Sequence, residues 1–193
     1  MSETRAVAGR QSGSSIGADE TFQAGRVTTM SAAHAVHDTY TAFLPSLLPV
    51  FIENLSLSKA SAGLLTVFMQ GPSLLQPVIG HLADRTGLRL LVILAPAVTA
   101  TMMSLLGIAP SYAVIALFLV VVGLASASLH AVGPVITGNL SGRSLGRGMG
   151  FWMVGGELGR TLGPIVVVTA VEVLGLSGTP WLMVGGILTS LLL

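Results

Sequence analysis

The sequence contains no cysteine and little charge. Its 193 residues include nine Lys or Arg and eight Asp or Glu, so that 9% are charged. The lack of cysteine excludes disulfides, thiolate catalysis and cysteine-based metal sites. Soluble domains carry about 25% charged residues, which argues against an ordinary soluble domain. A net charge of +1, with the basic residues spread along the chain, gives no indication of a nucleic-acid partner.

Apolar residues are abundant. They make up 52% of the chain, and the mean hydropathy is +0.84. A bilayer core about 30 Å thick needs about 20 helical residues to cross it. Five apolar segments have roughly this length, and a sixth begins near the end of the chain: 31–52, 60–79, 90–109, 113–136, 149–174 and 181–193. The predicted fold class is an all-α membrane protein with six helices.

The two ends of the chain depart from this pattern. Residues 1–29 are polar, rich in Gly, Ser and Ala, and lack the apolar core of a signal peptide. We expect a disordered cytoplasmic tail there, and Met30 is an alternative start. Segment 181–193 would rise only about 20 Å as a helix. We therefore expect a truncated sixth helix in a chain that belongs to a longer protein.

The positions of the basic residues predict the orientation of the helices. Seven would lie on one side of the membrane: Arg5, Arg10, Arg26, Arg85, Arg89, Arg143 and Arg147. Only Lys59 would lie on the other side. Because Lys and Arg concentrate in cytoplasmic loops, the N-terminus is predicted to be cytoplasmic.

The first apolar segment carries three ionisable side chains. At 100° per residue, His34, His37 and Asp38 share one face of a helix. An ionisable group inside a membrane span costs several kcal/mol and indicates function. A carboxylate beside imidazoles has the parts of a proton relay; alternatively, Asp38 caps the helix or pairs with His37 near a wet end. The three could contact a metal ion, but no fourth ligand is evident, and we expect none.

Segments 113–136 and 149–174 also carry polar groups. Glu157 and Arg160 lie three residues apart on one face of a helix. They could neutralise one another as an ion pair within the helix. Alternatively, Glu157 exchanges protons and Arg160 attracts an anionic substrate. Gly159 and Gly163 belong to a stripe of small residues that would let another helix approach closely. If the helices carrying His130, Glu157 and the first-segment groups line one cavity, their side chains converge in a single layer.

A short charged stretch separates the second and third apolar segments. It reads GHLADRTGLR over residues 80–89, and its order G-x-L-A-D-R-x-G-x-R resembles the cytoplasmic signature between helices 2 and 3 of the major facilitator superfamily of transporters. We expect a loop. The resemblance implies a conformational latch that does not bind substrate, formed by Gly80, Asp84, Arg85, Gly87 and Arg89.

Longer strings resemble the fosmidomycin-resistance branch of that superfamily. They include H-x-x-H-D-x-Y-x-x-F-L-P over residues 34–45 and GGELGRTLGP over residues 155–164. The string G-x-x-x-G-P of Gly159, Gly163 and Pro164 resembles the antiporter motif of helix 5. The resemblance implies proton-coupled drug efflux, hence antibiotic resistance, by a twelve-helix antiporter of the bacterial inner (plasma) membrane without a cofactor.

The same resemblance implies partners and roles. The partners would be protons, a small-molecule substrate, the lipid bilayer and a second, C-terminal half that this chain lacks, from the same gene or a separate chain. Proton coupling would fall to His34, His37, Asp38 and Glu157, and the substrate cavity to Tyr40, His130 and Arg160.

Other readings stay open. The chain is alternatively an inactive truncated fragment, a half-transporter that needs a six-helix partner, or a metabolite importer of the same superfamily. Many proton antiporters carry an arginine in mid-helix 4, where this chain has Val120, so any coupling mechanism through that arginine is excluded. The segment GLASAS over residues 123–128 lacks the G-x-S-G turn of an intramembrane serine protease. We therefore predict no enzyme activity.

Overall fold

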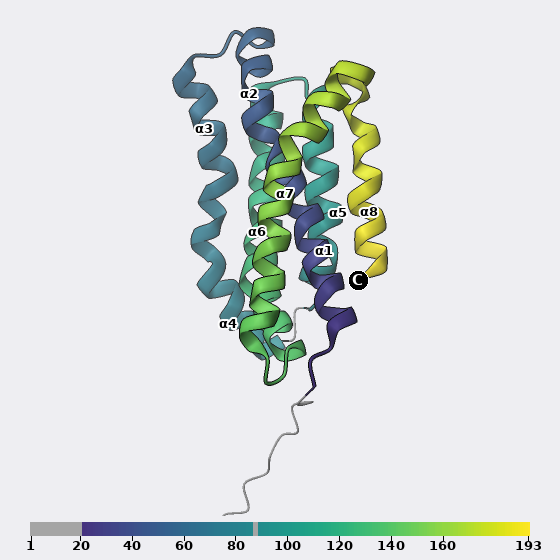
Figure 1. Ribbon diagram of the computed structural model, residues 1–193. Helices are drawn as coiled ribbons and strands as arrows, with labels where there is room; N and C mark the ends of the chain where they lie inside the picture. The colour runs from purple at the N-terminus through teal and green to yellow at the C-terminus, as the bar shows by residue number, and fades with distance from the viewer. Residues whose placement is uncertain (1–20, 87–88) are drawn as a thin grey trace, which may run out of the picture.

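The computed structural model describes residues 21–86 and 89–193, and every regular element within them is a helix. The helices stand side by side in one bundle (Figure 1). The elements are α1 Ala24–Thr41, α2 Phe43–Asn54, α3 Lys59–Gln70, η1 Gly71–Leu75, α4 Gln76–Thr86, α5 Arg89–Leu105, η2 Leu106–Ile108, α6 Tyr112–Leu140, α7 Leu145–Leu174, η3 Leu176–Leu182 and α8 Met183–Leu192. Consecutive elements combine into six rods, which confirms the predicted six-helix, all-α fold class.

Three continuous helices of the described chain are long and apolar enough to cross a membrane. They are Lys59–Thr86, Arg89–Ile108 and Tyr112–Leu140. Helix α7 has 30 residues, but Glu157 and Arg160 lie near its middle and lower its hydropathy. The first rod is divided between α1 and α2 because Pro45 has no N–H to donate to the carbonyl of Thr41. The break lies one turn beyond Asp38.

Helix α1 begins earlier than the sequence predicts. Its first turns, from Ala24, are helical rather than part of a disordered tail, so the predicted boundary near residue 30 was wrong. The N–H of Gln23 donates to the carbonyl of Leu140 at 3.0 Å, and the guanidinium of Arg147 lies 4.3 Å from the ring centroid of Phe22. These contacts and the complete burial of Val27 anchor the helix start. The rest of the predicted tail, residues 1–20, lies outside the described residues.

The predicted loop at residues 80–89 is mostly helix. Helix α4 continues through Gly80, Asp84 and Arg85 to Thr86, and α5 begins at Arg89. The loop prediction was therefore wrong for these positions. Charged residues do not end a helix, and a basic residue in the last turn, here Arg85, interacts favourably with the helix dipole. Gly87 lies outside the described residues.

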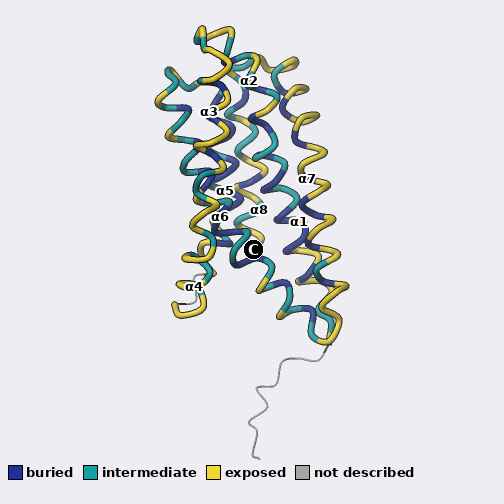
Figure 2. The backbone as a smooth tube through the Cα atoms, turned by 90° about the vertical axis from the view of Figure 1, so that its left-hand side faces the viewer, coloured by how far each residue is buried: buried dark blue, intermediate teal, exposed yellow. Residues whose placement is uncertain are grey.

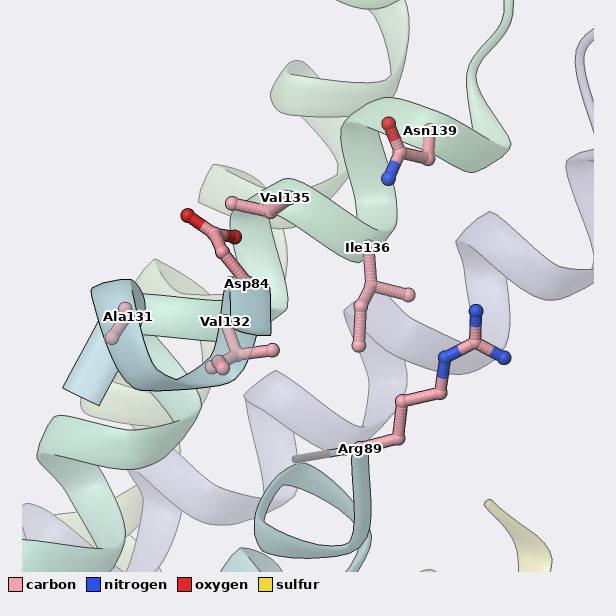
Figure 3. A pocket seen from close by; sticks show the side chains of 9 residues that line it. Asp84, Arg89, Ala131, Val132, Val135, Ile136 and Asn139 are labelled. Carbon is pink, nitrogen blue, oxygen red and sulfur yellow. The ribbon is translucent and has the colours of Figure 1, made fainter. Parts of the chain in front are cut away.

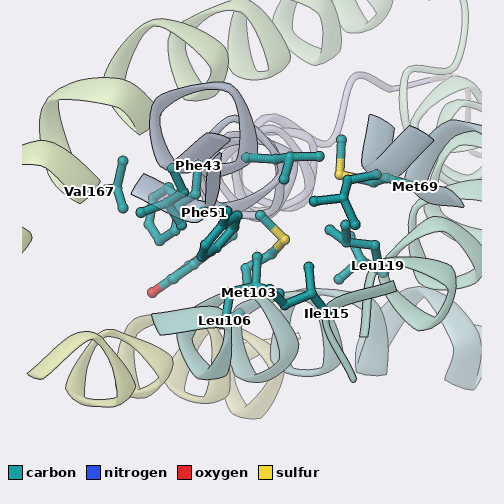
Figure 4. Close-up of a cluster of buried hydrophobic side chains, with 14 residues drawn as sticks. Phe43, Phe51, Met69, Met103, Leu106, Ile115, Leu119 and Val167 are labelled. Carbon is teal, nitrogen blue, oxygen red and sulfur yellow. The ribbon is translucent and has the colours of Figure 1, made fainter. Parts of the chain in front are cut away.

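Helices α1 and α7 make the most extensive contact in the bundle, while α5 packs on both α6 and α8. Exposed positions run along the outer side of α7 (Figure 2). One apolar cluster, drawn in Figure 4, joins Phe43 and Phe51 of α2 to Met103 and Leu119. A second cluster surrounds Trp152.

Candidate functional site: a buried polar layer between three helices

The contact between α1 and α7 depends on glycines. A Cβ added at Gly159 would overlap the backbone carbonyl oxygen of Ala35, and one at Gly163 would overlap that of Thr39. Because the obstructing atoms are backbone, no rotamer change could relieve the overlap. The stripe therefore lets the two backbones touch, and it sets the distance between the side chains that the helices carry.

Across this contact, Asp38 pairs with Arg160. The Nη1 atom of Arg160 donates to Oδ2 of Asp38 at 2.8 Å, although the residues are 122 positions apart. Asp38 is buried, with 2% exposure. The same guanidinium binds the exposed carboxylate of Glu157. Arg160 thus links a buried carboxylate, that of Asp38, to an exposed one, that of Glu157. The ion pair with Glu157 within α7, which the sequence predicts, is one of two ion pairs that Arg160 makes.

Two histidines complete the cluster. The Nε2 atom of His34 lies 3.3 Å from Oδ2 of Asp38 and 3.3 Å from Nε2 of His130. The Nε2 atom of His130 lies 3.7 Å from Oδ1 of Asp38. Each ring also donates from Nδ1 to a backbone carbonyl at 2.9 Å, His34 to Trp152 and His130 to Ser126. We call His34, Asp38, His130, Glu157 and Arg160 the polar layer.

The remaining sequence candidates, His37 and Tyr40, make no hydrogen bond to this layer. His37 is fully buried and makes no hydrogen bond of normal length; its ring interacts with the backbone of Ala95 on α5. Tyr40 donates its hydroxyl to the carbonyl of Leu182 at 2.5 Å, so its side chain ties α1 to the sixth rod. Asp38 does not pair with His37, and the face shared by His34 and His37 is divided between two neighbouring helices.

An open pocket lies beside the polar layer. It encloses about 150 Å³ and is lined by Asp38, Thr41, Met69, Gln70, Ser126, His130 and Arg160. A second pocket of about 330 Å³ shares Thr41, Met69, Gln70 and Arg160 with it and continues to Pro164. Together the two pockets form a groove between α3 and α7. Sequence reasoning missed Trp152, whose ring stacks on His34 with centroids 3.9 Å apart. The available signal was a tryptophan on the face of α7 that carries the glycines.

The possible metal-ligand set differs from the one considered from the sequence. The ligand atoms of His34, Asp38 and His130 lie within 4.8 Å of one another, and His130 takes the place of His37. One carboxylate oxygen of Asp38 is already bound to Arg160, so only the other is free to bind an ion.

Three of the latch residues, Gly80, Asp84 and Arg89, line a different pocket. About 330 Å³ is enclosed by Gly80, Ala83, Asp84 and Arg89 together with α6 residues from Ala131 to Asn139. The side chains of Asp84 and Arg89 point to different sides of it (Figure 3). Within residues 21–86 and 89–193, no ion pair joins Asp84 to Arg85 or Arg89.

Membrane-length helices that bury a charged cluster beside an open groove are typical of membrane transporter families. The chain belongs to the Major Facilitator Superfamily, whose family model matches residues 30–193. It is accordingly a multi-pass membrane protein of a transporter family, not an enzyme.

The curated relatives are distant. The chain is 25% identical over 170 residues to the fosmidomycin resistance protein of Escherichia coli (strain K12), covering 88% of this chain and 42% of that protein. It is 27% identical over 151 residues to the uncharacterized MFS-type transporter YfnC of Bacillus subtilis (strain 168), covering 77% and 36%. The chain thus spans about two fifths of the length of these relatives. No solved structure matches it.

Proposed function

We propose that this chain supplies the N-terminal half of a proton-coupled antiporter that exports small molecules or drugs by alternating access. The observation that carries the proposal is Asp38, a buried carboxylate shared between Arg160 and two histidines beside an open groove. Buried charges of this kind are costly and mark ion and proton pathways. The name of the Escherichia coli relative, a resistance protein, agrees with efflux.

The polar layer offers a route for coupling. Glu157 is exposed and can exchange protons with its surroundings, while Asp38 is enclosed. A proton that reaches the layer weakens the attraction between Asp38 and Arg160. Because that ion pair joins α1 to α7, its weakening changes the relative stability of two arrangements of these helices. The latch at the end of α4 would then limit the movement between these two arrangements of α1 and α7.

The distribution of basic residues along the bundle supports an inner-membrane protein with a cytoplasmic N-terminus. The start of α1, the end of α4 and the connection between α6 and α7 lie at one end (Figure 1), and they carry Arg26, Arg85 and Arg147. Lys59 begins α3 at the opposite end. The positive-inside rule therefore supports placing the former end in the cytoplasm.

A second six-helix half would cover the open side of the groove. The side chain of Glu157 is 66% exposed and that of Arg160 47% exposed. Either charge would be costly against lipid, so we propose a covering partner from the same gene or a separate chain. The alternatives are an inactive fragment and a metabolite importer. The DNA that follows the Leu193 codon, and transport by the chain with and without such a partner, distinguish them.

The test is export driven by a pH gradient in membrane vesicles. We expect Asp38→Asn to abolish uptake of drug into inverted vesicles, and Glu172→Gln, an exposed carboxylate on α7, to leave it intact. Membrane insertion of both variants is checked by extraction. Export by the Asp38→Asn variant at the unmodified rate would exclude Asp38 from coupling. If transport instead required an inward gradient of substrate, the result would favour the metabolite importer.

A further inference from the structure

We propose that His34 and His130 together hold one shared proton between their Nε2 atoms, beside the ionised carboxylate of Asp38. The histidine pair, rather than a carboxylate, is then the proton carrier of the polar layer. Its role in coupling rests on the proposed function; the shared proton itself is a property of the folded chain and can be tested without transport.

The hydrogen bonds of the outer nitrogens fix the inner ones. Nδ1 of His34 and Nδ1 of His130 each lie 2.9 Å from a backbone carbonyl oxygen, of Trp152 and Ser126 respectively. A carbonyl oxygen can only accept, so both Nδ1 atoms carry hydrogen. A neutral imidazole has one N–H. In the neutral state, both Nε2 atoms are therefore bare acceptors.

These two acceptors face one another at 3.3 Å. The carboxylate of Asp38 lies 3.3 Å from the first and 3.7 Å from the second, and its Oδ1 atom is buried without a hydrogen bond. Three electron-rich groups thus converge with no donor between them. A single proton resolves this arrangement, because it gives one ring an N–H that both the other ring and the carboxylate can accept.

The surroundings of Asp38 limit the pair to one proton. One side of its buried carboxylate is bound to Arg160, and both Nε2 atoms face the carboxylate. The carboxylate can therefore stabilise one imidazolium, whereas a second imidazolium would be repelled by the first across 3.3 Å.

No other described group supplies or removes charge at this depth. From α1, His37 also faces His130, with ring centroids 5.9 Å apart, but neither of its nitrogens has a hydrogen-bond partner. From α3, the pocket receives only the neutral side chains of Met69 and Gln70, and α5 offers the backbone of Ala95. Arg160 already binds Oδ2 of Asp38, so a metal ion would find only three ligand atoms where four are usual, and we favour the proton.

Nitrogen NMR of the folded chain tests this directly. The sequence has four histidines, so selective ¹⁵N-histidine labelling in nanodiscs gives four ring systems. We expect His34 and His130 to share a single proton near neutral pH, with coupling across an N–H···N bond. His34→Gln should abolish the shared-proton signal of His130, and the reverse variant that of His34. His81→Gln, an exposed control on α4, should change neither.

Three results would overturn the proposal. They are two neutral rings throughout the range between pH 6 and 8, independent protonation of each ring, and a signal that EDTA removes, which would indicate a bound metal ion. If the glutamine variants do not fold, Asp38→Asn gives the same test, because it makes the layer one charge more positive and should expel the shared proton. A shared proton in a protein that does not transport would refute the proposed function while leaving this inference intact.

Discussion

The polar layer and the end of α4 are both marked by charged sequence motifs, yet their structures differ. In the layer, Asp38 is 2% exposed and has three charged or ionisable partners. At the end of α4, Asp84 is exposed and has no ion pair within the part of the chain that the structure describes. The motif at α4 indicates the family, whereas the contacts of the layer indicate chemistry. Paired substitutions in the two regions can test this difference.

The largest expected effect comes from Arg160→Leu. It leaves the buried carboxylate of Asp38 with only its histidine partners, and loss of one member of a buried ion pair costs about 3–5 kcal/mol. Because His34 and His130 remain, we expect about 3 kcal/mol. Arg85→Leu, at an exposed position of α4, should change the free energy of unfolding by less than about 0.5 kcal/mol. Unfolding of both variants in detergent micelles measures the difference; equal losses would show that Arg160 does not stabilise the layer.

A smaller effect is expected where a glycine is replaced by alanine. At Gly159 the new methyl group meets the backbone of α1, and overpacking of this kind costs about 1–3 kcal/mol. At Gly146 of the same helix, and at Gly80 of α4, nothing lies within 4 Å of the added Cβ. There alanine should stabilise the helix by up to about 1 kcal/mol. Thermal unfolding should therefore give opposite signs, and a stable Gly159→Ala protein would mean that the backbones of α1 and α7 are not in contact.

The sequence predicts much of this arrangement, but not the pairing of the helices. Lengths of apolar segments predict the six rods, because crossing a bilayer fixes the length of a helix. Helical periodicity places His34 and Asp38 on one face, but it cannot reveal that His34 contacts α7 and that His37 faces α5. Asp38 and Arg160 are 122 positions apart in the sequence. They meet only because α1, and not another helix, packs against the glycine stripe of α7. That choice is made by packing of the whole bundle.

The ends of helices were harder to predict for a different reason. Charged residues such as Asp84 and Arg85 suggest a loop when the bilayer is assumed to end where charge begins. A helix, however, can extend into water beyond the bilayer, because its backbone hydrogen bonds are satisfied within it. The same reasoning applies to Ala24, which precedes the apolar segment but is already helical.

Tyr40→Phe tests whether a residue next to the polar layer contributes to stability or to substrate binding. The substitution removes one hydrogen bond, from the hydroxyl to the carbonyl of Leu182, which contributes about 1 kcal/mol to stability. Tyr40 was expected from the sequence to line the substrate cavity. Its contact with the sixth rod instead predicts a modest loss of stability with unchanged affinity for substrate. Substrate binding and unfolding measured on the same preparation check this, and weaker binding at unchanged stability would restore the cavity role.

The smallest effect on stability is expected for Asp84→Asn, and it is most informative beside Asp38→Asn. Both substitutions replace one carboxylate oxygen by an amide and keep the shape of the side chain. Asp84 is exposed, so its free energy of unfolding should change by less than about 0.5 kcal/mol. Asp38 is buried against Arg160, and its loss of charge leaves the guanidinium paired only with Glu157. If the end of α4 acts as a latch, Asp84→Asn should slow transport without lowering stability, whereas Asp38→Asn should lower both. Equal losses of stability would mean that Asp84 makes a buried contact that is absent among the described residues. Both regions would then depend on a buried carboxylate for stability.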